Sequence, residues 1–158
     1  MVATRFAVAI HILLLLACRR LDGPATSLRL ASSVNTNPVV VRRITGLLTR
    51  AGLIRVRRGP GGATLAREPA AITLGDVWGA VNPGCNRPLL PMHGHPDPGC
   101  PVGAGIHAVL SEAFSAAEQA MHESLSRTTL AGLVDGLDLP AGLQGCDAAH
   151  PASILSIA

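Results

Sequence analysis

The pair Asn37-Pro38 sets the start of a helix more firmly than any other signal in the chain. Asparagine is a favoured N-cap, and proline suits the first helical position because its missing N–H would have no partner there. Apolar residues then recur at helical spacing until Gly52 interrupts the pattern, at Val40, Val41, Ile44, Leu47 and Leu48. The spacing predicts a helix with one buried stripe and with arginines and threonines on its other faces.

A shorter helix is predicted just before this one, over Thr26–Val34, with a tight turn between the two. Two helices joined in this way form a helix-turn-helix, in which the later helix enters the major groove of DNA. The alternative is an ordinary helical hairpin whose basic face is only solvated.

An arginine-rich β-hairpin is predicted directly after the two helices. Its extended segments, 53–58 and 63–66, flank a glycine-rich turn at 59–62, where positive φ is allowed and the backbone can approach a phosphate closely. Alternation along the first segment places two of its arginines on one side and the third, Arg58, at the tip. The alternative is a hairpin that is merely solvated.

Charge is divided unevenly between the two halves of the chain. Up to Arg67 there are eleven arginines and one acidic residue, whereas from Glu68 onward there are two arginines and nine acidic residues. This asymmetry indicates that only the first half meets phosphate. With two Phe, one Trp and no Tyr, the chain lacks aromatic platforms for stacking single-stranded nucleic acid, so duplex DNA is the expected partner.

The amino-terminal run Phe6–Cys18 allows two interpretations. It is apolar apart from His11, and it ends in a sequence similar to a lipoprotein lipobox, which is typical of an export signal. Its thirteen residues are too few to span a bilayer, because a spanning helix needs about 20. The pair Arg19-Arg20 and the DNA-binding pattern favour instead a cytoplasmic protein with no membrane partner, in which a helix from about Val2 to Leu21 is buried nearly all round inside a bundle or a dimer. The alternative is an exported, lipid-anchored protein.

The second half of the chain is predicted to hold a short helix, a loop and a long helix. Thr73 can cap the short helix, which runs to Val81, and the following loop, 82–99, holds five of the chain's twelve prolines. From Pro101 a helix of roughly 26 residues, about 40 Å long, has an apolar stripe that a small domain cannot bury, so pairing with a second copy is expected. The stripe consists of Ile106, Val109, Leu110, Ala113, Phe114, Ala117, Met121 and Leu125.

Cys85 and Cys100 bracket the loop, which also carries His93 and His95. These four side chains could bind zinc or another soft metal, and an iron–sulfur cluster could use the two cysteines with the partner subunit's His11. Alternatively, Cys100 forms a reactive thiolate because the start of the long helix lowers its pKa, with Cys85 as the resolving thiol. A third possibility is no cysteine chemistry. The residues alone favour a protein without a resident cofactor, and zinc or an iron–sulfur cluster is the alternative.

Three runs of the sequence, 32–44, 51–62 and 72–77, resemble the Rrf2 family of bacterial winged-helix regulators, which includes the iron–sulfur regulators IscR and NsrR. The similarity covers about Met1 to Leu133 and is greatest to the branch without three closely placed cysteines. It implies a homodimeric transcription factor whose recognition helix and wing bind a palindromic operator, with the wing tip in the minor groove. Where the family usually continues the wing with glycine and an aromatic residue, this chain has Ala63-Thr64.

The expected fold is mainly α with a small β-hairpin wing, namely a winged helix-turn-helix domain followed by a long dimerisation helix. The expected parts are a DNA-binding domain at 1–81, a sensor-type loop at 82–100, dimerisation helices at 101–137 and a flexible tail at 138–158. The last helix would be capped by Thr128 or Thr129 and end near Leu137. The expected function is a transcriptional repressor, redox-responsive or, alternatively, metal-responsive, and no enzyme motif occurs. Contacts to DNA are expected from Thr36, Asn37, Val39, Arg42, Arg43, Arg55, Arg57, Arg58, Gly59 and Gly61.

Overall fold

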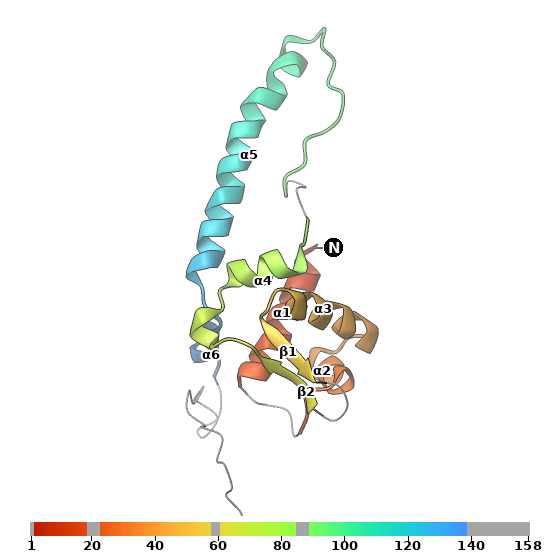
Figure 1. The fold of residues 1–158 in the computed structure, drawn as a ribbon. Coiled ribbons are helices and arrows are strands. Elements are labelled where there is room, and N and C mark those ends of the chain that lie inside the picture. The colour runs from red at the N-terminus through yellow and green to blue at the C-terminus, as the bar shows by residue number, and fades with distance from the viewer. Residues whose placement is uncertain (1, 19–22, 58–60, 85–88, 139–158) are drawn as a thin grey trace, which may run out of the picture.

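The computed structural model describes residues 2–18, 23–57, 61–84 and 89–138. They form a mainly helical domain with one two-stranded antiparallel sheet, from which a long helix projects (Figure 1). The predicted combination of helices with one small hairpin is confirmed, and the short 3-10 helix η2 is an element that the sequence did not indicate. In chain order the elements are α1 (Val2–Ala17), α2 (Ser27–Val34), α3 (Pro38–Arg50), β1 (Ile54–Arg57), β2 (Gly62–Leu65), η2 (Pro69–Ala71), α4 (Leu74–Val81), α5 (Pro101–Arg127) and α6 (Leu130–Asp135).

Helix α1 forms the centre of the hydrophobic core and packs against α2, α3, α4, α6 and β2. Its side chains at Ala9, Ile12, Leu13 and Ala17 are buried. Within the single chain the helix is not buried all round, because Thr4, Ala7 and His11 are exposed along one side, so the expected burial inside a bundle or a dimer stays a prediction. The helix also ends at Ala17, before the expected end near Leu21, and residues 19–22 lie outside the described part of the chain.

Two contacts join α1 to α4. The rings of Phe6 and Trp78 meet edge to face with centroids 5.1 Å apart. Nη1 of Arg5 donates to the carbonyl oxygen of Val81, at the end of α4, over 2.8 Å. The run that resembles an export signal is therefore a core helix here, and no helix among the described residues has the length and apolar character needed to cross a membrane.

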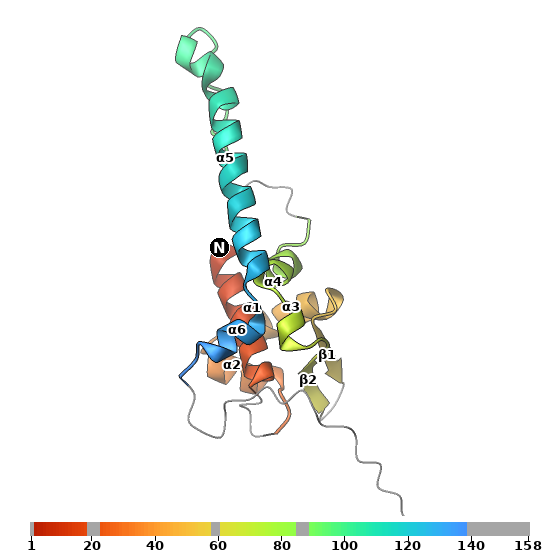
Figure 2. The ribbon, with the colours of Figure 1, turned by 90° about the vertical axis from the view of Figure 1, so that its left-hand side faces the viewer.

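Helix α5 projects away from the domain and touches it mainly near its carboxyl end (Figures 1 and 2). Its base is held by backbone pairing, since the amide of Leu74 donates to the carbonyl oxygen of Thr128 over 2.9 Å and the amide of Leu130 donates to that of Ile72 over 2.8 Å. Thr129 caps α6, which settles the choice between the two predicted caps. The long predicted helix is confirmed, and it has 27 residues.

Residues 89–100 run back alongside the projecting part of α5 (Figure 1). The amides of Leu89 and Leu90 donate to Oε1 of Glu118 over 2.6 and 3.2 Å. Further along, the rings of His93 and His107 meet edge to face with centroids 5.5 Å apart. This segment attaches to one side of α5 and leaves another side open.

The predicted apolar stripe of α5 is therefore divided between two environments. Val109 is 71% exposed, whereas the other large members of the stripe are half-buried within the chain itself, namely Ile106, Leu110, Phe114, Met121 and Leu125. The sequence pattern did not separate these two faces, because the covering segment comes from a loop with no periodicity.

Candidate nucleic-acid interface

Helices α2 and α3 pack against each other, and capping residues set the turn between them. Asn35 ends α2 in the left-handed conformation, with φ of 54°, and the amide of Thr36 donates to the carbonyl oxygen of Ala31 over 3.0 Å. Asn37 then caps α3, because its Oδ1 accepts a hydrogen bond from the amide of Val39 over 2.8 Å. The predicted start of the helix is confirmed, and the turn fixes the direction of α3.

Helix α3 turns one face to the core and the opposite face to solvent. The buried face carries Val41, Ile44, Leu47 and Leu48. The exposed side chains are Val39, Val40, Arg42, Arg43, Thr49 and Arg50. The prediction that Val40 belongs to the buried stripe is wrong, because it lies on the solvent side of the first turn. Helical spacing places Gly46 in the middle of the outer face, and a Cβ built on it would meet no other atom within 4 Å. The outer face of α3 therefore has little side-chain bulk at its middle, at Gly46, with Arg42, Arg43 and Arg50 around it.

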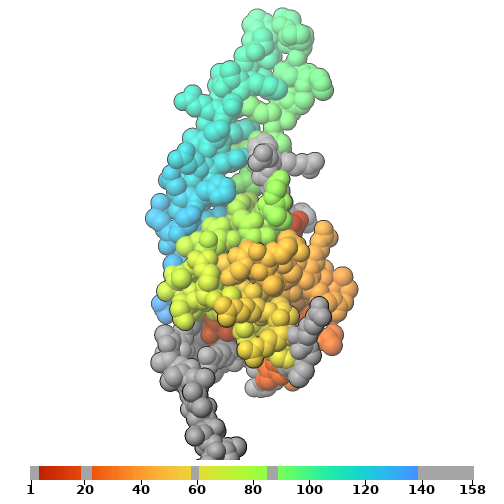
Figure 3. Space-filling model, viewed as in Figure 1, coloured from red at the N-terminus to blue at the C-terminus, as the bar shows by residue number. Residues whose placement is uncertain are grey.

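The hairpin of β1 and β2 lies beside α3 on the same face of the molecule (Figure 3). The strands are antiparallel, with Arg57 opposite Gly62. Arg55 and Arg57 are exposed, and so is Val56 between them, so burial does not alternate along the exposed part of β1. The second strand begins at Gly62 instead of Ala63, so this glycine belongs to the strand and not to the turn.

Gly62 joins the hairpin to the segment before α2. Its φ is +64°, and a Cβ at this position would lie 2.5 Å from the backbone nitrogen of Ala25. The next amide, that of Ala63, donates to the carbonyl oxygen of Ala25 over 3.0 Å. The side chain of Ala63 is buried in the core. A small residue therefore fits at this position, where Ala63-Thr64 stands in place of the glycine and aromatic residue expected from the resemblance.

The face formed by α3 and the hairpin carries positive charge without neighbouring acids. Between residues 23 and 67 the chain has no Asp or Glu, and its described arginines there are Arg29, Arg42, Arg43, Arg50, Arg55, Arg57 and Arg67. Among the described residues, only the last of these has an ion-pair partner. The others are free to meet phosphate or base edges.

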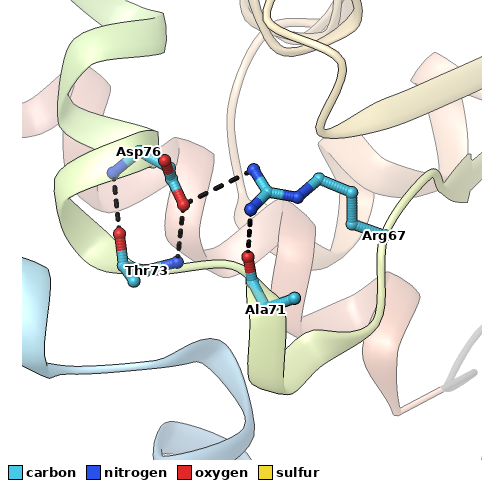
Figure 4. A network of polar contacts seen from close by, with 4 residues as sticks. All are labelled: Arg67, Ala71, Thr73 and Asp76. Atoms are coloured by element: carbon cyan, nitrogen blue, oxygen red, sulfur yellow. Dashed lines mark hydrogen bonds and ion pairs between the residues drawn. The ribbon is translucent and has the colours of Figure 1, made fainter.

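Arg67 links the end of the hairpin to the start of α4 (Figure 4). Its Nη1 lies 3.5 Å from Oδ2 of Asp76, and its Nη2 donates to the carbonyl oxygen of Ala71. Asp76 and Thr73 form a capping box, in which each side chain accepts a hydrogen bond from the other's amide over 3.0 Å. The start of α4 therefore contacts both the hairpin, through Arg67, and the base of α5, because the amide of Leu74 donates to the carbonyl oxygen of Thr128.

Most residues predicted to contact DNA lie on this one face. Of the predicted set, Arg58 and Gly59 lie outside the described residues, and Thr36 is half-buried in the turn. Asn37, Gly61 and the remaining members are exposed or partly exposed. Gly46 lies on the same outer face and was not in the predicted set, although a glycine inside a helix costs about 1 kcal/mol relative to alanine.

Cys100 lies at the far end of α5, where it is the exposed N-cap residue. Its amide donates to the carbonyl oxygen of Asp97 over 3.2 Å. The thiol makes no capping hydrogen bond of ordinary geometry, but the amides of Gly103 and Val102 face the sulfur closely enough to lower the pKa of Cys100. The predicted direction of this shift is confirmed.

The predicted metal ligands are not brought together within the described residues. No group of three or more His, Cys, Asp or Glu side chains in that part of the chain could hold a metal ion. His93 packs against His107 instead, and the carbonyl oxygen of His93 lies 3.0 Å from Nε2 of His107. Cys85 lies outside the described residues, so the set of Cys85, His93, His95 and Cys100 stays a prediction.

Comparison with known proteins identifies the family to which this chain is similar. The model of the Rrf2 family, described as iron-dependent transcriptional regulators, matches residues 2–136. A protein of Bacillus subtilis (strain 168) named as a HTH-type transcriptional regulator, YwnA, is 41% identical over 137 residues, which are 87% of this chain and 99% of the relative.

Solved structures agree with this match. One chain described as a DNA-binding protein superposes with a TM-score of 0.64 at 38% identity, over 82% of this chain and 97% of its own. Another, from Lactobacillus plantarum and described as a transcriptional regulator, superposes with a TM-score of 0.70 at 28% identity, over 90% of this chain and 94% of its own. The predicted winged helix-turn-helix fold is confirmed.

Proposed function

The chain belongs to the Rrf2 family of transcriptional regulators and not to a family of enzymes, and from this premise we propose that it binds a palindromic DNA operator as a homodimer and represses transcription. It would act in the cytoplasm, where the chromosome is accessible. The observation that carries the proposal is the single basic face on which α3 and the hairpin lie side by side (Figure 3). A recognition helix in the major groove and a wing on the neighbouring backbone would both reach one duplex from this face.

The exposed side of α5 supports the homodimer. Small or apolar side chains recur on it at helical spacing and are solvent-exposed in the single chain, namely Val102, Val109, Ala113, Ala116, Ala117 and Ala120. Two copies of α5 packed through this side would bury it and bring two recognition helices into a fixed relation. A two-fold dimer in turn requires two half-sites related by the same symmetry, which is a palindrome.

Cys100 supports redox control within this proposal. It is exposed and its pKa is lowered by the amides at the start of α5. With hydrogen peroxide as oxidant, the thiolate sulfur would attack one peroxide oxygen as the O–O bond breaks. The sulfur would thereby be oxidised to sulfenic acid, and the hydroxide that leaves would take up a proton to form water. A change at this first turn would alter how the two copies of α5 cross, and thereby the separation of the recognition helices. The predicted resolving thiol, Cys85, lies outside the described residues.

The family's description as iron-dependent raises the question whether these residues fit iron. Iron–sulfur clusters and mononuclear iron sites take several Cys, His or carboxylate ligands. The described part of the chain supplies no group of three such side chains. The described residues do not assemble an iron site, and the proposal includes no step at iron.

Salt-dependent binding tests the proposal. A duplex selected from a random pool by the full chain should be bound as a palindrome, with affinity that falls steeply as salt rises because arginines displace counterions. Arg57→Ala should reduce the salt slope by about 0.9 for each phosphate that the arginine no longer neutralises. The matched control is Arg127→Ala, since Arg127 lies at the end of α5, away from the basic face. Failure to select any duplex, or an Arg57→Ala slope equal to that of the control, would overturn the proposal.

A further inference from the structure

Val39 is an exposed apolar residue in the middle of a basic surface. It is 60% exposed on the first turn of α3, and helical spacing places it between Arg42 and Arg43. Its neighbour Val40 is also exposed. Valine gains nothing from solvent exposure and forms helices less readily than alanine, lysine or glutamate. Nothing in the fold therefore explains a valine at this position.

The position of Val39 is nevertheless held firmly. Its amide donates to Oδ1 of the N-cap Asn37 over 2.8 Å, and proline precedes it in the first helical position. A valine side chain in a helix has one strongly preferred rotamer. Its two methyl groups therefore point outward in one defined direction, which suits a contact with a specific partner more than it suits a solvated surface.

We propose that Val39 determines operator specificity by contacting the 5-methyl group of a thymine in the major groove. This inference rests on the proposed function, because it needs α3 in that groove. The N-terminal residues of a recognition helix are the ones that reach base edges. The thymine methyl is the apolar group that unmodified bases present there, and apolar side chains recognise it. The flanking Arg42 and Arg43 would contact guanine or phosphate and bring the valine to the base edge.

The choice of a base over a protein partner follows from the charge around Val39. The chain has no Asp or Glu between residues 23 and 67, and the exposed side chains one helical turn from Val39 are Arg42 and Arg43. A purely apolar protein surface would leave these guanidinium groups without partners on binding. A duplex offers phosphate for the arginines and a methyl group for the valine at the same time.

The test replaces thymine with uracil, which removes the methyl group and keeps every hydrogen-bonding atom. In a duplex selected by the wild-type chain, each thymine is replaced singly and the dissociation constant is measured at one fixed salt concentration. At one symmetric pair, replacing a single thymine should weaken binding about fourfold, which is the effect of burying one methyl group, and replacing both should weaken it about 15-fold. Val39→Ala should bind thymine and uracil duplexes with equal affinity at that pair.

The matched control is Val56→Ala. Val56 is also an exposed valine, at 52%, but it lies in the hairpin and not on α3, so this variant should keep the preference for thymine. The inference is overturned if no uracil substitution weakens wild-type binding, or if Val39→Ala keeps the full preference. In either case a selected duplex that is still bound leaves the proposed function intact, whereas a chain that selects no duplex overturns both.

Discussion

Replacing Gly46 with alanine should stabilise the protein and weaken its binding to DNA. Gly46 lies inside α3, and a Cβ built there meets no other atom within 4 Å, so the folded chain has room for the methyl group. Glycine in a helix interior is less stable than alanine by about 1 kcal/mol, because more backbone freedom is lost on folding. Gly46→Ala should therefore raise the free energy of unfolding by up to about 1 kcal/mol and the melting temperature by roughly 3 °C.

The effect on DNA binding should have the opposite sign. If the outer face of α3 lies in the major groove, the absent side chain at Gly46 lets the helix backbone come close to the duplex. An added methyl group in a tightly packed contact costs about 1–3 kcal/mol, which corresponds to a loss of about tenfold in affinity for each 1.4 kcal/mol. A dimer would suffer this loss at both half-sites.

Thermal melting and a duplex-binding titration on the same preparation separate the two effects. Gly79→Ala is the matched control, because Gly79 also lies in a helix, α4, with no other atom within 4 Å of a built Cβ. That variant should gain a similar amount of stability and keep wild-type affinity. If Gly46→Ala bound DNA as tightly as Gly79→Ala, the reasoning that places α3 deep in the groove would be refuted.

Three other perturbations test separate parts of the structure. Gly62→Ala should destabilise the fold by about 1–3 kcal/mol in urea unfolding, because alanine is strained at positive φ and its Cβ would strike the backbone of Ala25; an unchanged midpoint would contradict the described hairpin junction. Val109→Glu should convert the proposed dimer to a monomer in sedimentation, and a dimer that persisted would exclude the open side of α5 as its interface. Alkylation of Cys100 should accelerate with rising pH around a midpoint below that of an ordinary thiol, because the thiolate forms above its lowered pKa. The difference between wild type and Cys100→Ser isolates this thiol, and a midpoint at the ordinary value would contradict the shift.

Local signals explain why the helix-turn-helix could be predicted closely from the sequence. Helix α3 begins at Pro38 because Asn37 caps it, and each of these preferences acts over a few residues. The same holds for Thr73, whose capping box with Asp76 starts α4. Such short-range preferences leave little to tertiary context, so the sequence pattern and the structure agree there.

Features that depend on distant parts of the chain could not be predicted in the same way. The second strand begins at Gly62 because the backbone of Ala25, far away in sequence, approaches it closely. The stripe of α5 is divided because Leu89 and Leu90 attach the preceding segment to Glu118. Periodicity describes how one helix is patterned, but it does not say which element covers which side.

Gly46 and Val39 extend the same reasoning to the candidate site itself. In the sequence, a glycine within a helix and an exposed valine near its start are both weak choices by helix propensity. The structure offers no packing reason for either residue, because a Cβ at Gly46 would meet nothing within 4 Å beyond its chain neighbours and the adjacent helix backbone, and Val39 is 60% exposed. Residues that weaken the free protein without any internal reason are expected where a partner binds. Both lie on the outer face of α3, so a single partner that reaches deep between the arginines accounts for them together.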